Sequence, residues 1–352
     1  MRFERRFDTP LSVRLAVSLV SLLAALALTA LFLALIGISP KEALTEMWVA
    51  AFVDSYGLSE TLTKAIPLAL CATGLALSYK MVIWNIGAQG QVLMGALATV
   101  AVVRYAPTLP IWAMLPALLL AGAVAGGLWA AISAFLKVKW KVNEIISTLM
   151  LNYIALNLKD YLTFGPWRDP SSLGFPMTKA FPAAAKLPLI GFGRVHAGIY
   201  LALLLAFFFA WMLKRSKVGY ELRVVGENPR AAHFAGINAP RLTIKVLFLS
   251  GMLCGLAGAV TMTGLEWRLQ GGFNAAFGNT AIIVAWLGGL SPIAGLLVSI
   301  LMGGLLVGGE SLQVMMNLPS AGVQIIQGFI LMFLVAGQFF ILYRPVRKGA
   351  RE

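Results

Sequence analysis

The sequence predicts an all-α protein, a polytopic membrane helix bundle of about ten transmembrane helices, and three observations predict it. Hydrophobic residues make up 59% of the 352 residues, charged residues make up 12%, and the mean hydropathy is +0.84. The apolar runs approach the roughly 20 residues that a helix needs to cross the hydrocarbon core. The alternating pattern of a membrane barrel is absent, and lipid offers backbone N–H and C=O groups no partner, so each span must be helical.

Taken in order, the apolar runs define ten predicted spans within one transmembrane domain over residues 1–352. The first run is longer than the apolar region of a signal peptide, so it is interpreted as a retained span. The ten spans lie near residues 15–38, 61–79, 88–104, 111–136, 145–164, 197–213, 242–264, 280–291, 293–308 and 322–343.

The charge distribution predicts the orientation of these spans. The formal charge is +14, and the basic residues cluster at the ends of spans, which is the positive-inside pattern and not a nucleic-acid footprint. With both termini cytoplasmic, about 19 of the 28 basic residues and about 6 of the 14 acidic ones fall on cytoplasmic segments. The sequence therefore predicts an N-in, C-in protein that binds the lipid bilayer and no nucleic acid.

Two stretches are then predicted to lie outside. Residues 39–60 contain Trp48 and Tyr56, which are expected to anchor the chain at the membrane interface. Residues 165–196 are rich in proline and glycine, and because proline interrupts long helices, this external loop is expected to form an irregular cap.

One charged, amphipathic block, residues 214–241, interrupts the apolar sequence and is predicted to be cytoplasmic. Within it, GENPRAAHFAGI has Asn228 as an N-cap, Pro229 in the first turn and Gly236 at the end, which predicts a helix of about two turns. Its small residues suit a groove on another protein, although a solvated connector is the alternative. The residues expected to make this contact are Gly226, Glu227, Asn228, Pro229, Arg230, Ala231, Ala232 and Gly236.

Glycine interrupts the predicted spans at two places. WNIGAQGQ, residues 84–91, separates the second and third spans, and Gly288, Gly289 and Pro292 split two short spans, the eighth and ninth. Unwound backbone is tolerated at membrane depth only where it faces protein or water, so paired interruptions of this kind indicate a solute route. Two tight cytoplasmic turns are the alternative interpretation.

A polar stripe is predicted at the start of the fifth span. Glu144, Thr148 and Asn152 recur every four residues, so they share one helix face that should avoid lipid. Asn143 and Glu144 are also typical of a helix start. The amides of the WNIGAQGQ segment and the hydroxyl and amide of the fifth span could bind a polar solute or could form hydrogen bonds between helices. The candidate route residues are Asn85, Gln89, Gln91, Thr148 and Asn152.

Several functional classes have no support in the sequence. There is no G-x-x-x-x-G-K-[ST] phosphate loop, so the chain is not itself an ATPase. No catalytic residue, metal site or cofactor is predicted: His196 and His233 are interpreted as surface residues, and Cys71 and Cys254 as small core residues. Three G-x-x-x-G pairs predict close helix packing. They are Gly122/Gly126, Gly251/Gly255 and Gly304/Gly308.

The segments WNIGAQGQVLMGA (84–96), NEIISTLMLNYIA (143–155) and GENPRAAHFAGI (226–237) resemble permease subunits of ATP-binding-cassette importers. They are similar to the branch that serves branched-chain amino acids, simple sugars and nucleosides, and most of all to its nucleoside and simple-sugar permeases. The likeness runs from about Leu62 to Leu342. By this resemblance, residues 226–236 correspond to the coupling helix that docks on the ATPase.

The resemblance implies a non-enzymatic transport subunit that imports nucleosides across a bacterial inner membrane. Its implied partners are a separate ATPase subunit that hydrolyses ATP, a periplasmic or lipoprotein solute-binding protein and a second permease, expected to be a paralogue. A simple-sugar permease is the alternative within the family. An ion-coupled secondary transporter is the alternative of another class, and it is disfavoured because the acidic residues lie at span ends and not deep in the membrane.

Overall fold

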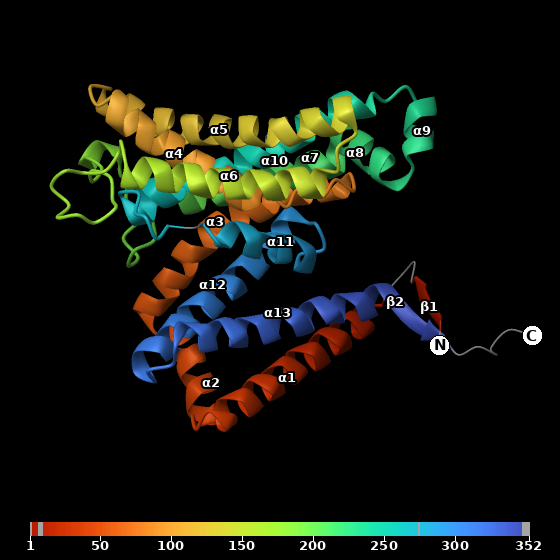
Figure 1. The fold of residues 1–352 in the computed structure, drawn as a ribbon. Coiled ribbons are helices and arrows are strands. Elements are labelled where there is room, and N and C mark those ends of the chain that lie inside the picture. Colours follow the sequence, from red (N-terminus) through yellow and green to blue (C-terminus); the bar gives the residue numbers. More distant parts are fainter. Residues whose placement is uncertain (1, 6–9, 274, 347–352) are drawn as a thin grey trace, which may run out of the picture. The chain divides into compact units, whose positions relative to one another are not determined.

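The structure is a computed structural model that describes residues 2–5, 10–273 and 275–346 (Figure 1). Most of the described chain is helical, which confirms the predicted fold class. One antiparallel pair of short strands, β1 (Arg2–Arg5) and β2 (Tyr343–Val346), joins the two ends of the described chain. The chain forms two compact units, residues 1–61 with 304–352 and residues 62–303, which are described separately.

Three helices pack at the centre of the larger unit: α4 (Ala88–Tyr105), α5 (Ile111–Trp140) and α10 (Ala239–Thr261). Glycines allow two of them to approach closely. A Cβ atom added at Gly126 of α5 would lie 2.5 Å from Cα of Gly255 in α10, and one at Gly251 would overlap Gly126. The predicted close packing of the first two glycine pairs is therefore confirmed, because each pair provides the contact surface for the other.

The remaining helices of the larger unit surround this centre. Figure 1 shows the irregular loop 165–197, with its short 3-10 helix η2, at one end of the α4, α5, α6 and α10 layer and α8 and α9 at the opposite end. The helices that lie wholly in this unit are α6 (Glu144–Phe164), α7 (Gly198–Arg215), α8 (Lys217–Glu227), α9 (Pro229–Phe234), the π-helix η3 (Met262–Glu266) and α11 (Phe277–Leu287). The helices α3 (Ser55–Lys80) and α12 (Pro292–Met315) belong to both units.

The smaller unit contains α1 (Leu11–Leu35), α2 (Pro40–Trp48), the π-helix η1 (Val49–Val53) and α13 (Ser320–Leu342), and α1 packs along α13. The third glycine pair also allows close packing, since Gly308 lies against Met47. Beside it, the Ser311 hydroxyl donates a hydrogen bond of 2.6 Å to Glu46. The sequence predicted only an external stretch here, although Pro40 in the first turn signals a helix start.

Six helices among the described residues are long and apolar enough to cross a membrane: α3, α5, α7, α10 with η3, α12 and α13. The count of ten and the orientation remain predictions. The prediction of a short ninth span was wrong, because α12 has 24 residues. By contrast, α11 has 11 residues and is about 16 Å long, roughly half of the hydrocarbon core.

Candidate functional site

The short helix α9 forms where the sequence predicted it. The Asn228 side chain accepts hydrogen bonds from the backbone N–H groups of Arg230 (3.1 Å) and Ala231 (3.0 Å), which confirms its role as N-cap. Ala231 is exposed and Phe234 is 89% exposed, whereas Ala232 is buried. The outer face of α9 is therefore open to a partner, while Ala232 belongs to the interior.

The inner face of this region belongs to a buried cluster, here called the coupling cluster. It joins the end of α3 and the connection that follows it to α8, α9 and α10. Its members include Leu77, Met81, Ile83, Leu222, Val225, Ala232, Leu242 and Val246. Gly226 at the end of α8 also lies against the end of α3, because a Cβ atom there would overlap the carbonyl oxygen of Lys80. The helix α9 is thus joined, through apolar contacts, to the end of α3 and to Ile83, the residue that precedes WNIGAQGQ.

Two of the predicted route residues form a buried amide pair. The Asn85 side chain donates to Oε1 of Gln91 (3.1 Å) and to the Ser250 hydroxyl of α10 (3.0 Å), and its oxygen accepts from Nε2 of Gln91 (2.8 Å). Both residues are at most 1% exposed. The pair holds the α3–α4 connection against α10.

Two members of the predicted polar stripe of α6, Thr148 and Asn152, face the same connection, whereas Glu144 forms an ion pair with Lys137 of α5 (2.6 Å). Thr148 accepts a hydrogen bond from the backbone N–H of Ile86 (3.3 Å), and Asn152 donates to the carbonyl oxygen of Ile86 (2.9 Å). The Asn152 oxygen also accepts from the backbone N–H of Gly90 (2.8 Å) in the first turn of α4. The side chains of α6 therefore satisfy backbone groups that no α4 hydrogen bond serves.

Gln89 differs from the other four candidate residues because it is half-exposed. Its side-chain oxygen accepts a hydrogen bond of 3.0 Å from Asn279, an exposed residue in the first turn of α11. Gly278 also lies against the backbone of Gln89, so the starts of α4 and α11 meet closely. Asn279 was missed in the sequence, where nothing marks it as a neighbour of the WNIGAQGQ segment.

The structure brings the two glycine-interrupted segments together through aromatic rings. Trp84 of the first segment stacks on Trp286, two residues before Gly288, with ring centroids 5.4 Å apart and an interplanar angle of 16°. Tyr79 of α3 lies 5.5 Å from Trp84 and 6.0 Å from Trp286. These three residues are called the aromatic cluster. Sequence reasoning missed Tyr79 and Trp286, because only folding places them beside Trp84.

An irregular stretch precedes α11. The backbone N–H of Thr178, in the loop 165–197, donates to the carbonyl oxygen of Leu269 (2.9 Å), and the Leu269 N–H donates to the Thr178 hydroxyl (3.0 Å). The backbone N–H of Gly271 donates to the carbonyl oxygen of Pro176 (2.8 Å). The Gly271 carbonyl oxygen accepts from Nζ of Lys159, a buried α6 cation paired with Asp160 at 2.6 Å. The non-helical backbone at residues 269–271 is therefore held by hydrogen bonds to the loop 165–197 and to Lys159 of α6.

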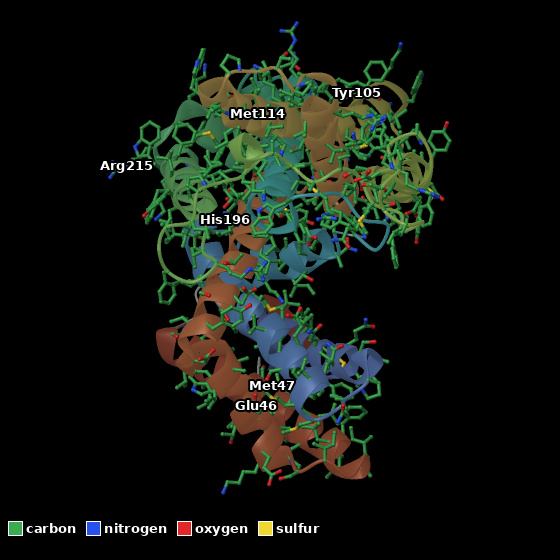
Figure 2. The ribbon with its side chains drawn as sticks, turned by 90° about the vertical axis from the view of Figure 1, so that its left-hand side faces the viewer. Glu46, Met47, Tyr105, Met114, His196 and Arg215 are labelled. Atoms are coloured by element: carbon green, nitrogen blue, oxygen red, sulfur yellow. The ribbon has the colours of Figure 1, made fainter. Side chains whose placement is uncertain are left out.

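The interpretation of His196 as a surface residue was wrong, because its ring is 1% exposed. Figure 2 labels it inside the larger unit, and the ring lies against Gly264 and Gly198, with Nδ1 accepting a hydrogen bond from the backbone N–H of Gly198 (3.2 Å). Burial lowers the pKa of His196 to about 4. Cys71 and Cys254 are buried and free, as predicted for core residues.

The helices, the polar interior and the apolar surface define a multi-pass membrane protein. Residues 57–335 match the family model described as branched-chain amino acid transport system / permease component. The chain belongs to this family and is a transport subunit without catalytic activity of its own.

Named relatives match nearly the whole chain. A glucose ABC transporter permease of Haloferax volcanii is 34% identical and covers 98% of this chain and 93% of its own. A guanosine ABC transporter permease of Bacillus subtilis is 31% identical over 96% of this chain and 98% of its own length. A nucleoside ABC transporter permease of Lactococcus lactis is 27% identical over 96% of this chain and 95% of its own length. Each of these organisms also has a second permease that matches 57 to 76% of this chain.

Proposed function

We propose that this chain is the membrane-spanning permease subunit of an ATP-driven importer that moves nucleosides across a bacterial inner membrane. The observation that supports this proposal most directly is the coupling cluster, which connects the exposed helix α9 to the end of α3 and to Ile83, directly before the glycine-broken segment. An importer driven by a separate ATPase needs such a connection, because force applied at the surface must reach the solute path.

The docking element of this proposal is α9 with its flanks, from Gly226 to Gly236. Its exposed face carries Ala231 and Phe234, a small residue beside a large apolar one, and a face of this kind fits an apolar groove. Its buried face is held by Ala232 in the coupling cluster. A push on α9 would therefore move the α3–α4 connection with it, since packed interiors transmit displacement.

The proposed solute route passes the starts of α4 and α11. Of the five candidate residues, Gln89 is the one offered to the solute, together with Asn279, because both side chains are accessible and present amide donors and acceptors. Asn85, Gln91, Thr148 and Asn152 are assigned to the support of this wall, because their polar atoms bond to one another and to the backbone.

The proposed solute is a nucleoside, supported by the guanosine and nucleoside permeases that match the chain over at least 95% of their own length. A simple sugar is the second candidate, favoured by the glucose permease at 34% identity. The proposed partners are an ATPase subunit, a solute-binding protein and a second permease. A paralogue is proposed as the second permease because each of the three organisms has two permeases that match this chain.

The docking proposal is tested with Ala231→Arg and Phe234→Glu in the complete transporter. Both changes lie on the exposed face of α9, so the permease should insert and fold normally while the ATPase no longer co-purifies and ATP-dependent uptake is lost. Val142→Arg is the matched control, since Val142 is 38% exposed in the connection between α5 and α6. Normal co-purification of the ATPase with both α9 variants would refute the docking assignment.

The energy source is tested in vesicles loaded with ATP. Uptake of labelled guanosine should require ATP hydrolysis and persist when an uncoupler dissipates the ion gradient. Uptake that needs no ATP and stops with the uncoupler would instead indicate an ion-coupled carrier. Uptake of glucose without uptake of guanosine would select the sugar alternative.

A further inference from the structure

The aromatic cluster joins three separate elements of the larger unit beside the two glycine-broken segments. Tyr79 lies in the last turn of α3, Trp84 lies in the α3–α4 connection, and Trp286 lies in the last turn of α11. The indole planes of the two tryptophans are nearly parallel, at 16°. A stacked pair of this geometry presents the flat faces that a planar ring prefers.

The three rings differ in burial and in hydrogen bonding. Tyr79 is 5% exposed and its hydroxyl donates to the carbonyl oxygen of Asn85 (3.0 Å), so it forms a fixed base. Trp84 is 37% exposed and Trp286 is half-buried. Separating the two tryptophans should therefore cost less free energy than moving Tyr79.

The backbone beside each tryptophan is unusual. Val82, two residues before Trp84, has φ +56°, and Leu290, four residues after Trp286, has φ +56°. A β-branched residue with positive φ is rare, because its side chain crowds the backbone. Such strained positions persist where the surrounding structure holds them, and they gather at sites that bind or switch.

Polar groups continue along the same helix. Asn279 lies seven residues, or two turns, before Trp286, so both fall on one side of α11 about 10 Å apart. Asn279 is bonded to Gln89, which lies in the same segment as Trp84. The WNIGAQGQ segment and α11 therefore meet at two places: the amide pair of Gln89 and Asn279, and the stacked rings of Trp84 and Trp286.

We propose that Trp84 and Trp286 form a stacking site for a planar heteroaromatic ring, such as a nucleobase, at the inner end of the route. This inference rests on the proposed importer function and deepens it. A ring that enters between the indoles replaces the indole–indole contact with two indole–base contacts, while Gln89 and Asn279 serve the polar part of the solute. The closed stack then reforms behind the departing solute and seals the route.

The stacking site predicts a dependence on aromatic character. Base–aromatic stacking changes affinity by roughly 5- to 150-fold for each base. Trp84→Leu and Trp286→Leu keep an apolar side chain but remove the flat face. Each should raise the guanosine concentration for half-maximal uptake at least about fivefold, with Trp84→Phe and Trp286→Phe lying between these variants and the wild-type protein.

The competing explanation is that these residues anchor the chain at the membrane interface, as tryptophan often does. Trp112, which is 81% exposed at the start of α5, is the matched control for that role. Uptake is measured in proteoliposomes that contain the complete transporter and is normalised to the amount of permease bound to its ATPase. If the Leu variants at 84 and 286 match Trp112→Leu in guanosine dependence, the tryptophans are anchors and the stacking site is wrong.

A second measurement avoids substitutions. The wild-type transporter is irradiated with 8-azidoguanosine during turnover, and the labelled peptides are identified by mass spectrometry. Adducts on Trp84 or Trp286 that excess guanosine suppresses support the site, and guanosine-sensitive adducts that lie only elsewhere overturn it. A wild-type transporter that imports no nucleoside at all would instead refute the proposed solute, which separates the two failures.

Discussion

Replacement of Asn152 by leucine should destabilise the protein strongly, because this one side chain serves two backbone groups at the start of α4. Its amide donates to Ile86 and its oxygen accepts from Gly90, at 2.9 and 2.8 Å. Asn152 is 3% exposed, so water would not replace the lost partners. A buried group left without a partner costs about 1 to 3 kcal/mol, whereas interhelical hydrogen bonds in membranes average nearer 0.6 kcal/mol. The expected loss of unfolding free energy is therefore about 2 to 4 kcal/mol.

The same helix supplies the matched control, Asn157→Leu. Asn157 is exposed and donates only within α6, to the carbonyl oxygen of Tyr153 (2.8 Å), so its replacement should cost well under 1 kcal/mol. Both variants are compared by detergent-induced unfolding of the purified permease and by guanosine uptake per folded complex. The reasoning is refuted if Asn152→Leu unfolds like Asn157→Leu while uptake falls, because Asn152 would then contact the solute.

Three further outcomes are expected. The unfolding free energy should fall by up to about 3 kcal/mol as the pH drops from about 6.5 to 4. In this range the unfolded chain gains a proton that the buried His196 accepts only near pH 4. The variant His196→Gln, measured over the same pH range, should remove most of this dependence. Cysteines at Ser171 and Lys217 should react with an impermeant thiol reagent only from outside and only from inside, respectively, and labelling of both from one side would overturn the topology. Gly226→Val should lower uptake per folded transporter, because the added atoms overlap a carbonyl of α3 and displace the start of the docking element. Gly272→Val, where an added Cβ meets nothing within 4 Å, is the control.

The sequence predicted those features that depend on local spacing. The cap at Asn228 and the proline after it determine the start of α9 wherever the segment lies, so this helix was found with its first residue. The four-residue spacing of Thr148 and Asn152 likewise predicted a shared face, and both are buried against the WNIGAQGQ connection. The spacing does not show which groups these two side chains bind. Their hydrogen-bond partners decide whether they line a water-filled route or hold helices together.

Long-range partners explain the other differences. Gly288 and Gly289 mark an interruption just after Trp286, but the contact of Trp286 with Trp84 depends on how α11 packs beside the end of α3. His196 lies in a loop rich in glycine and proline, which suggested exposure, but the ring fills space that Gly264 leaves open. The boundary of α12 was missed because a glycine-rich helix resembles a broken one in sequence, although helix packing in membranes favours glycine.

The contacts also identify which element is able to move when ATP drives the cycle. The WNIGAQGQ segment is bonded to α10 through Ser250, to α6 through Asn152 and to α3 through Tyr79, so these helices should move as one body at this end. The contacts between α11 and that body include the stack of two tryptophans with Tyr79 beside it, one amide hydrogen bond and the close approach at Gly278. Apolar and amide contacts of this kind separate more easily than a buried network in which each broken bond leaves a polar group unsatisfied. A displacement delivered by α9 is therefore expected to open the structure between α4 and α11, where the exposed amides lie.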